Sequence, residues 1–418
     1  MLHFLYSLFF RFALPFVLLR LWWSGRENPE VWRNWQQRLG YVSRSEEPVI
    51  WVHAVSVGET IAAAPLVKAL LSRNPGSSIL MTAMTVTGLE RARVMFGDQV
   101  RYAYSPYDTP GSVRRFVERV RPRALVIMET ELWPNMIAAT RRRQVPIFLI
   151  NARLSERSAR GYERVGSLVR PLLASIGWIA AQAREDASRF LRIGAQPETV
   201  SVTGSIKFDV DITPELRAAA RQVRAAFGDN RPVWIAASTH EGEDRQLLDA
   251  HRQVLAHHPE SLLVIVPRHP ERFDDVAALV TAQGLSLARR SKGESPAAMQ
   301  VYLGDTMGEL LMLFGASDIA FVGGSLIERG GHNPLEPAAW GMPVLSGPHV
   351  FNFETIYGQL ADGEGVFITE DCQQLAARLN SLIGDPALAD RAGNNALAVV
   401  EANRGALARV VDGIMGRV

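Results

Sequence analysis

Short apolar runs that alternate with amphipathic helical stretches are the feature of this chain that most constrains its fold. From Pro48 onward these runs are apolar at nearly every position rather than at every second one. Continuous apolar strands are typical of parallel sheets buried on both faces, and their alternation with helices indicates an α/β fold. The strands predicted in the first half are Val49–Ala54, Ile79–Ala83, Ala124–Met128, Val145–Ile150, Ile176–Ala181 and Val200–Thr203.

A second series of the same kind predicts a second α/β unit, with strands at Val233–Ala237, Leu262–Val266, Ile319–Val322, Val344–Leu345 and Val366–Ile368. The chain has 418 residues, which is too long for one ordinary core and favours two domains with a ligand cleft between them. The expected divisions are an anchor over 1–23, a first unit over 24–208, a connector over 209–231, a second unit over 232–395 and a C-terminal helix over 396–418.

The first 23 residues are almost wholly apolar and are interrupted by His3, Arg11 and Arg20. A bilayer span needs about 20 apolar residues, and an arginine near its middle costs about 2.5–3.5 kcal/mol on insertion. No small-residue cleavage site follows, which argues against a signal peptide. Interleaved arginines and clustered tryptophans favour an anchor in the membrane interface, with its basic side kept cytoplasmic. An ordinary buried helix is the alternative.

Charge and cysteine content narrow the possible partners. The formal net charge is only +2 and no long basic run is present, so a role in binding nucleic acid has little support. Residues 1–45 nevertheless carry six arginines against two glutamates, which indicates contact with an anionic membrane surface. The single cysteine, Cys372, excludes intramolecular disulfides and favours a reducing compartment.

Polar residues follow the predicted strands, where ligands of open α/β sheets bind. Glu59 follows the first strand at a helix start, where the helix dipole favours a carboxylate and is expected to keep its pKa low. Glu129 follows the third strand and Lys207 the sixth. In the second half Arg268 offers a forked donor for phosphate or carboxylate. His269 is a candidate acid, although a lone histidine is more often structural.

The segment from Gly331 to Glu336 predicts a helix start with Asn333 as its cap and Pro334 in its first position. Free amides at such a start form a site for one phosphate, and Glu336 one turn later is suited to a ribose diol. Met307-Gly308-Glu309 predicts another helix start. A helix cap without any ligand remains the alternative.

Several chemistries are excluded by missing motifs. The first strand is not followed by Gly-x-Gly-x-x-Gly, and the chain has neither a P-loop nor a Gly-x-Ser-x-Gly elbow. Asp209-Val-Asp211 imitates a metal motif but falls in the expected connector, so neither a metal site nor a cofactor is predicted. Transfer chemistry between two units survives this elimination.

Nine segments together resemble the 3-deoxy-D-manno-octulosonic acid (Kdo) transferases of lipopolysaccharide assembly. They occur in the family's order over nearly the whole chain, which makes the resemblance specific. The segments are Ser56–Glu59, Met128–Asn135, Asn151–Ser155, Gly204–Asp209, Ser238–Gly242, Pro267–Arg272, Gly304–Leu310, Phe321–Ser325 and Gly331–Glu336.

The resemblance implies a GT-B glycosyltransferase fold, CMP-Kdo as donor, the tetraacylated lipid A precursor (lipid IVA) as acceptor, inversion without an essential metal, and a place at the cytoplasmic face of the inner membrane. It assigns Glu59 as the general base, and Glu129 and Lys207 as groups that stabilise the transition state. A GT-B transferase or epimerase using a uridine-diphosphate sugar and a non-catalytic membrane scaffold are the alternatives. The CMP site that it implies comprises Pro267, Arg268, Met307, Gly308, Glu309, Asn333, Pro334, Leu335 and Glu336.

Overall fold

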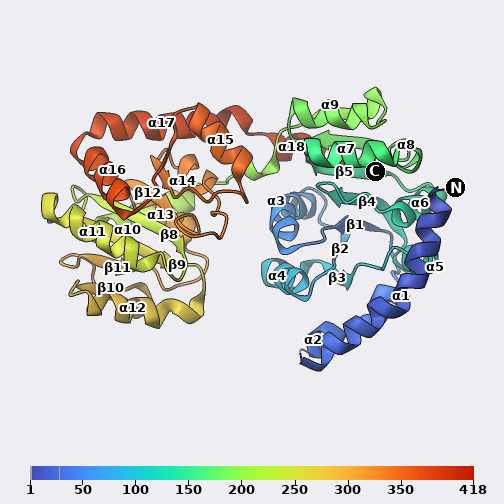
Figure 1. Cartoon of the computed structure of the whole chain (residues 1–418), viewed down its shortest axis with the longest axis horizontal. Coiled ribbons are helices and arrows are strands. Elements are labelled where there is room, and N and C mark those ends of the chain that lie inside the picture. The colour runs from blue at the N-terminus through green and yellow to red at the C-terminus, as the bar shows by residue number, and fades with distance from the viewer. Residues whose placement is uncertain (1, 28) are drawn as a thin grey trace. The chain divides into compact units, whose positions relative to one another are not determined.

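The computed structural model describes residues 2–27 and 29–418, which form two compact units (Figure 1). Unit 1 comprises Met1–Lys207 together with Arg404–Val418, and unit 2 comprises Phe208–Asn403. Each unit contains a seven-stranded sheet whose strand pairs are all parallel. This confirms the prediction of two parallel-sheet α/β units.

The sheet of unit 1 has the strand order β3-β2-β1-β4-β5-β6-β7. Register places Ile50 of the central strand opposite Ile79 on one side and Ala124 on the other. Successive residues of β1 point to opposite faces of the sheet, since Ile50 belongs to one buried hydrophobic cluster and Trp51 to another. The strands are β1 (Val49–His53), β2 (Ser78–Ala83), β3 (Arg101–Tyr104), β4 (Pro122–Met128), β5 (Ile147–Ala152), β6 (Trp178–Ala181) and β7 (Val200–Val202).

Helices cover both faces of this sheet, as parallel sheets require. They are α1 (Leu2–Glu27), α2 (Pro29–Trp32), α3 (Val57–Arg73), α4 (Val86–Phe96), α5 (Pro110–Val120), α6 (Pro134–Arg142), α7 (Glu156–Arg164), α8 (Gly166–Leu173), α9 (Arg184–Arg192) and α18 (Ala406–Met415). Short 3-10 turns lie at η1 (Trp35–Leu39), η2 (Gly97–Gln99), η3 (Pro197–Thr199) and η4 (Ile206–Phe208).

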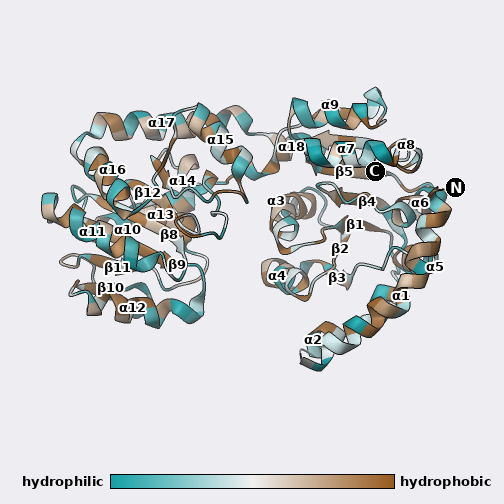
Figure 2. Ribbon diagram, in the orientation of Figure 1, coloured by the Kyte–Doolittle hydropathy of each residue, from teal (hydrophilic) through white to brown (hydrophobic). Residues whose placement is uncertain are grey.

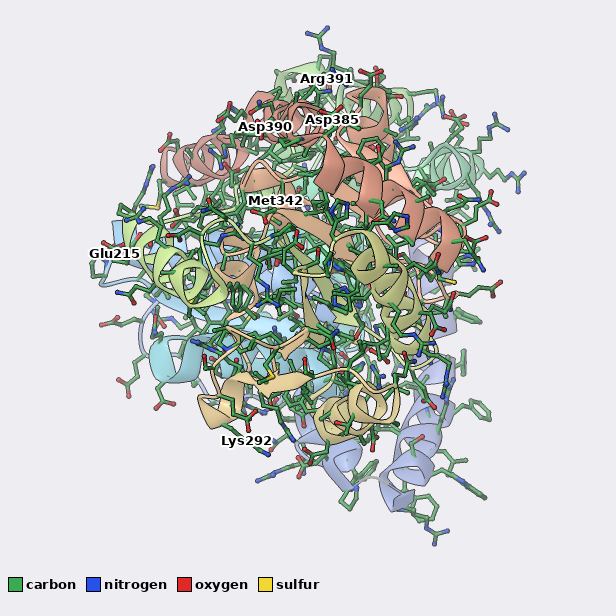
Figure 3. All side chains as sticks on the ribbon, turned by 90° about the vertical axis from the view of Figure 1, so that its left-hand side faces the viewer. Glu215, Lys292, Met342, Asp385, Asp390 and Arg391 are labelled. Carbon is green, nitrogen blue, oxygen red and sulfur yellow. The ribbon has the colours of Figure 1, made fainter. Side chains whose placement is uncertain are left out.

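The sheet of unit 2 has the order β10-β11-β9-β8-β12-β13-β14. Met342 is buried, whereas charged side chains such as Glu215, Lys292 and Asp390 are exposed (Figure 3). The strands are β8 (Val233–Thr239), β9 (Leu262–Pro267), β10 (Leu287–Arg289), β11 (Val301–Leu303), β12 (Ile319–Val322), β13 (Val344–Ser346) and β14 (Val366–Ile368). The helices are α10 (Pro214–Phe227), α11 (Asp244–His257), α12 (Phe273–Ala282), α13 (Leu310–Gly315), α14 (Leu335–Ala339), α15 (Glu354–Asp362), α16 (Cys372–Gly384) and α17 (Pro386–Asn403), with 3-10 turns η5 (Pro270–Arg272) and η6 (Arg290–Lys292).

The division of the chain differs from the expected one at two places. The expected connector 209–231 belongs to unit 2, because Val223 and Phe227 of α10 are buried in its core. The expected C-terminal helix 396–418 is divided between the end of α17 in unit 2 and α18 in unit 1. A Cβ at Gly413 of α18 would lie 2.2 Å from the Trp178 ring, so glycine permits this close packing.

Strands β3, β10 and β11 were not predicted from the sequence. Two of them, β3 and β10, lie at sheet edges, and β10 and β11 have only three residues each. Arg101 and Arg289 also interrupt the apolar pattern. Because these strands are held by pairing with a longer neighbour, their own sequence carries little signal.

Helix α1 is the one helix among the described residues that is long and apolar enough to cross a membrane. Figure 2 shows the helix as largely hydrophobic, and none of its candidate span is buried, which excludes the alternative of an ordinary buried helix. Polar contacts attach its first turns to unit 1: Tyr6 donates to Asp108 at 3.0 Å and Ser7 donates to Asn135 at 2.9 Å. The exposed apolar side chains are Phe4, Leu5, Leu8, Phe9, Phe12, Phe16, Val17, Leu19, Trp22 and Trp23.

Candidate active site

Glu59 lies in the first turn of α3, directly after β1. Ser56 caps this helix and accepts a hydrogen bond from the Glu59 amide at 3.3 Å. The Glu59 carboxylate in turn accepts from the Val55 amide at 2.8 Å and from the Ser56 hydroxyl at 3.0 Å. This reciprocal arrangement is close to a capping box. It explains locally why the carboxylate is held at this strand end.

The pKa of Glu59 contradicts the expectation of a low value. Burial, together with the negative charges of Glu131 and Glu129, raises the pKa to about 7 against the hydrogen bonds from Val55 and Ser56. Only 8% of the residue is exposed. Loss of hydration therefore outweighs the helix start. A carboxylate with a pKa near neutrality is suited to accept a proton at physiological pH.

Glu129 and Lys207 are brought together by the structure. Glu129 follows β4 with a left-handed backbone (φ +56°), which is uncommon for a residue other than glycine. The Lys207 ammonium lies 3.6 Å from the Glu129 carboxylate, and both side chains are partly exposed. Lys207 belongs to the turn η4 and is not at a strand end. Glu59 is electrostatically coupled to Glu129 and Glu131, so these carboxylates form an acidic site beside Lys207.

Asn151 holds the turn that carries Lys207, a role that the sequence did not indicate. It is fully buried in β5 with a left-handed backbone (φ +54°). Its side-chain oxygen accepts from the Ile206 amide at 3.2 Å and from the Ser205 hydroxyl at 3.3 Å. The segment Asn151–Ser155 was part of the family resemblance, but no feature of it pointed to this contact.

His53 is the last residue of β1 and is fully buried. Its Nδ1 lies 2.9 Å from the Ser105 hydroxyl, and its ring meets Trp133 edge to face at 5.0 Å. Burial lowers the pKa of His53 to about 3, so the imidazole is neutral. His53 therefore supports the site as a packed, hydrogen-bonded side chain.

In unit 2, Arg268 follows β9 and is electrostatically coupled to the segment after β12. Its amide donates to the Thr239 carbonyl at 3.0 Å, which fixes the turn beyond Pro267. The Arg268 charge lowers the pKa of Glu336, although burial raises that pKa overall. The same charge also lowers the pKa of His332. The structure thus brings Arg268 and Glu336 to one edge of the sheet.

The helix start at Asn333 differs from its prediction. Helix α14 begins at Leu335 rather than at Pro334 and contains five residues. The Asn333 side chain accepts from the Leu335 amide at 3.1 Å, and its amide group donates to Glu336 at 3.4 Å. The N-cap is therefore Pro334 and not the predicted Asn333, although the Asn333 side chain does accept from the first helical amide. So short a helix contributes little dipole to an anion.

Met307, Gly308 and Glu309 follow β11, and their helix α13 begins only at Leu310. Gly308 has a left-handed backbone (φ +86°), and Met307 is 58% exposed. The Glu309 carboxylate receives two hydrogen bonds from Arg290, at 2.8 and 3.0 Å. Glu309 thus closes a loop in addition to any contact with a ligand.

Glu243 organises the same edge of unit 2 and was not singled out from the sequence. Its fully buried carboxylate accepts four backbone hydrogen bonds, of 2.7 to 3.0 Å. Burial raises the pKa of Glu243, and the amide donors oppose that rise. The carboxylate joins the loop after β8 to the loop after β12. The four donors are the amides of His240, Gly324, Ser325 and Leu326.

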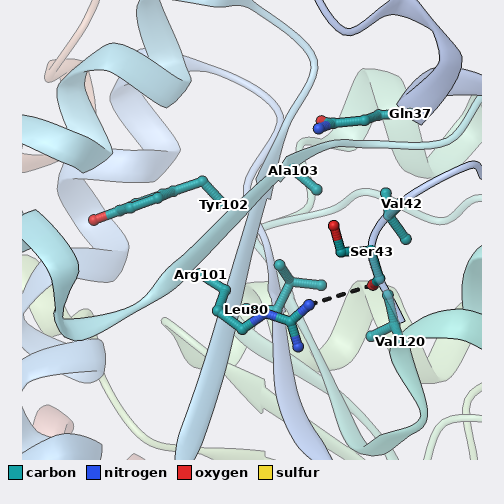
Figure 4. Close-up of a pocket in the computed structure, with 8 residues that line it drawn as sticks. All are labelled: Gln37, Val42, Ser43, Leu80, Arg101, Tyr102, Ala103 and Val120. Atoms are coloured by element: carbon teal, nitrogen blue, oxygen red, sulfur yellow. Dashed lines mark hydrogen bonds between the residues drawn. The ribbon is translucent and has the colours of Figure 1, made fainter. Parts of the chain in front are cut away.

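A cavity of about 160 Å³ lies elsewhere in unit 1, lined by Leu80, Arg101 and Tyr102 among others (Figure 4). Arg101 closes one side by donating to the Ser43 carbonyl at 3.3 Å. Ligand pockets usually measure about 300–1,000 Å³, so this cavity is too small for a nucleotide sugar. Over residues 2–27 and 29–418, no group of three or more His, Cys, Asp or Glu side chains is arranged to hold a metal ion.

Comparison with known proteins identifies the family. Residues 33–210 match the family model of 3-deoxy-D-manno-octulosonic-acid transferase (kdotransferase). The chain is 41% identical to the 3-deoxy-D-manno-octulosonic acid transferase of Haemophilus influenzae over 417 residues, which covers 99% of this chain and 98% of the relative. The chain belongs to the Kdo transferase family. The corresponding enzyme of Bordetella pertussis is 38% identical, with 98% of each chain covered.

The second half and the overall fold agree with this membership. Residues 235–399 match the family model of glycosyl transferases group 1, so the chain is a glycosyltransferase. The structure of a UDP-GlcNAc 2-epimerase from Neisseria meningitidis matches 88% of this chain and 100% of its own, with a TM-score of 0.58 and 17% identity. At that identity the likeness shows only a shared fold. This fold is of the GT-B kind, which the resemblance to Kdo transferases implied.

The raised pKa of Glu59 predicts a pH-dependent effect on stability. The folded-state pKa of about 7 lies above the ordinary 4.5, so the folded protein binds the Glu59 proton more tightly than the unfolded chain does. The contribution of protonated Glu59 to the free energy of unfolding is therefore fully present below pH 4.5 and is lost as the pH rises through about 7. Glu59→Gln removes that loss because glutamine does not ionise. The melting temperature of the variant, relative to wild type, should therefore increase between pH 5 and 8. A pH-independent difference in thermal unfolding would contradict the raised pKa.

Proposed function

We propose that this chain is an inverting glycosyltransferase that moves Kdo from CMP-Kdo to the tetraacylated lipid A precursor during lipopolysaccharide assembly. The observation that carries the proposal is the full-length identity to Kdo transferases, combined with a buried carboxylate of near-neutral pKa at Glu59. The direct test is to incubate the purified chain with CMP-Kdo and the lipid precursor and to weigh the product. A lipid of unchanged mass would reject the proposal.

Glu59 is the proposed general base. In one displacement, the acceptor hydroxyl oxygen forms a bond to the anomeric carbon of Kdo as the bond from that carbon to the CMP phosphate breaks. The bonding electrons leave with the phosphate, and the hydroxyl proton passes to Glu59. One base on the face opposite the leaving group suffices, and attack from that face inverts the configuration. The ionised form of Glu59 is required, so the rate should rise with pH through about 7.

Lys207 and Glu129 are the proposed stabilisers of the transition state. Negative charge grows on the phosphate as its bond to Kdo breaks, and a fixed cation lowers the free energy of that state. Glu129, 3.6 Å from the Lys207 ammonium, is suited to orient it. Asn151 supports this pair through the backbone of the turn at Ile206.

The proposed CMP site lies in unit 2. Arg268 is suited to the donor's phosphate or carboxylate, and Glu336 to the ribose. Pro267 fixes the turn at Arg268, while Asn333, Pro334 and Leu335 fix Glu336. Met307, Gly308 and Glu309 complete the proposed site from the loop after β11.

Helix α1 is proposed to attach the enzyme to the cytoplasmic face of the inner membrane. Its exposed phenylalanines would enter the lipid, while Arg11 and Arg20 would meet anionic headgroups. The contacts of Tyr6 and Ser7 keep the start of the helix on unit 1. This favours a helix that lies in the interface over one that crosses the bilayer.

Two alternatives make different predictions. A GT-B enzyme using a uridine-diphosphate sugar would bind UDP more tightly than CMP, as calorimetry on the purified chain would show. The epimerase likeness does not favour that alternative, since at 17% identity it concerns the fold alone. A non-catalytic scaffold would add no sugar in the mass-spectrometric assay.

Glu59→Gln tests the base. The variant keeps the size and hydrogen-bonding capacity of the side chain but cannot take up the proton, so transfer should fall about 10²–10⁴-fold. CMP-Kdo binding should be retained. Glu90→Gln, on the exposed surface of α4, is the matched control and should transfer Kdo normally. A folded Glu59→Gln variant with near wild-type turnover would remove Glu59 from the mechanism.

Lys207→Ala tests the cation. The interaction of the Lys207 ammonium with the phosphate should strengthen as negative charge develops there in the transition state. The substitution should therefore lower kcat more than it lowers the affinity for CMP. Lys68→Ala removes an exposed lysine of the same unit and serves as the control. Single-turnover rates and CMP titration would separate the two effects. Equal losses of rate and affinity, or no loss, would exclude this role.

Phe12→Asp combined with Phe16→Asp tests the anchor. These residues are 69% and 74% exposed, and charging them should shift the protein from the membrane to the soluble fraction after sedimentation. Val94→Asp changes an equally exposed apolar residue of α4 and should leave the protein on the membrane. Deleting residues 1–23 should also release a protein that binds CMP, but it removes the Tyr6 contact with Asp108. Persistent membrane binding of the double variant would reject the anchor.

A further inference from the structure

Three histidines from three loops meet at the edge of unit 2 where β8, β9 and β12 end. The Nε2 atoms of His240 and His332 lie 2.8 Å apart, and the two rings are parallel within 3°. The His269 ring stands edge-on to His240, with 5.3 Å between centroids. The His269 side chain is 47% exposed, so the cluster is reached from solvent on that side.

The contact between His240 and His332 fixes how many protons the pair can hold. A distance of 2.8 Å between two nitrogens requires one hydrogen between them, donated by one ring and accepted by the other. When both rings are neutral, one tautomer of each satisfies this bond. One additional proton converts one ring into an imidazolium that still donates to the other. A second additional proton would leave no acceptor and break the bond.

The surroundings hold the pair neutral in the absence of a ligand. Burial, and to a lesser extent nearby positive charges, lowers the pKa of both His240 and His332 to about 4. A Cβ on Gly324 would lie 3.1 Å from the His332 ring, so backbone covers one side of the pair. The cations around the pair are Arg268, Arg272 and Arg329, and His269 is a further neighbour. The other titratable groups of these loops are Glu241, Glu243, Asp244, Glu271 and Glu328, and Glu336 and Tyr357 lie next to them.

Four of these acids are already engaged, while Glu241 and Glu328 are exposed. Glu243 accepts four backbone hydrogen bonds, and Asp244 is paired with Arg272. A carboxylate oxygen of Glu271 lies 3.8 Å from Nδ1 of His269, and Glu336 accepts a hydrogen bond from the Asn333 side chain. Arg268 and the histidine pair therefore present donors and potential positive charge to an incoming anion.

We propose that the His240–His332 pair takes up one proton when a nucleotide phosphate binds to unit 2, and thereby becomes a cationic ligand of that phosphate. This inference rests on the proposed CMP site, because His332 directly precedes Asn333 and the pair is coupled to Arg268. A phosphate close to the pair favours the charged form of an imidazole and offsets the effect of burial. Binding of the nucleotide and uptake of the proton are then thermodynamically linked.

Calorimetry on the full chain in detergent tests this coupling, with CMP as the probe near pH 7 in buffers of different ionisation enthalpy. The phosphate of CMP is mostly a dianion there, since the second pKa of a phosphate monoester is about 6. Wild type should take up a net fraction of a proton per CMP, and its affinity should rise as the pH falls, by at most about tenfold per pH unit. Cytidine, which lacks the phosphate, should cause no uptake.

Histidine-to-glutamine variants identify the group that takes up the proton. Glutamine can keep a hydrogen bond at the position of Nε2 but cannot be protonated, so uptake should disappear in both His240→Gln and His332→Gln. His257→Gln changes an exposed histidine of α11 and should behave as wild type. No proton uptake by wild type, or uptake that persists in both variants, would overturn the inference. If UDP binds with this pattern and CMP does not bind, the pair keeps its role while the proposed donor fails.

Discussion

The buried carboxylate of Glu243 is the constraint on which the functional edge of unit 2 depends. A buried charge is costly unless it is fully hydrogen-bonded, and here four backbone amides supply the bonds. Because the donors come from two loops, this one side chain fixes both the start of the His240 segment and the turn at Gly324. The positions of the histidine pair and of the segment leading to Asn333 depend on this connection between the two loops.

Buried polar side chains that accept backbone hydrogen bonds also hold loops in place in unit 1. Asp108 accepts from the amides of Asn135 and Met136 at the start of α6, and Asn151 holds the turn before Lys207. Glu59 also accepts hydrogen bonds from one amide and one hydroxyl, but burial and the charges of Glu131 and Glu129 outweigh them. The remaining cost appears as a pKa near 7. Burial that its hydrogen bonds do not fully offset is therefore what suits Glu59 to the proposed role of base.

The sequence predicted those features that depend on local patterns. Continuous apolar runs identified most strands, and the position of Glu59 directly after the first strand placed its carboxylate at the start of α3. The pKa of Glu59 was predicted wrongly because its burial and its acidic neighbours come from tertiary packing. Likewise, His240 and His332 are 92 positions apart, so no local spacing could reveal their contact. The amphipathic pattern of α18 shows a buried face but not which sheet it covers.

The return of residues 404–418 to unit 1 has a consequence for biosynthesis. Ala406, Val410, Val411 and Ile414 are buried against the sheet formed by the first 207 residues. During translation the apolar face that receives them stays uncovered until α18 has left the ribosome. Unit 2 is continuous from Phe208 to Asn403 and can complete its core earlier. The unit that begins first is therefore finished last, and in that interval it exposes an aggregation-prone surface that chaperones would need to shield.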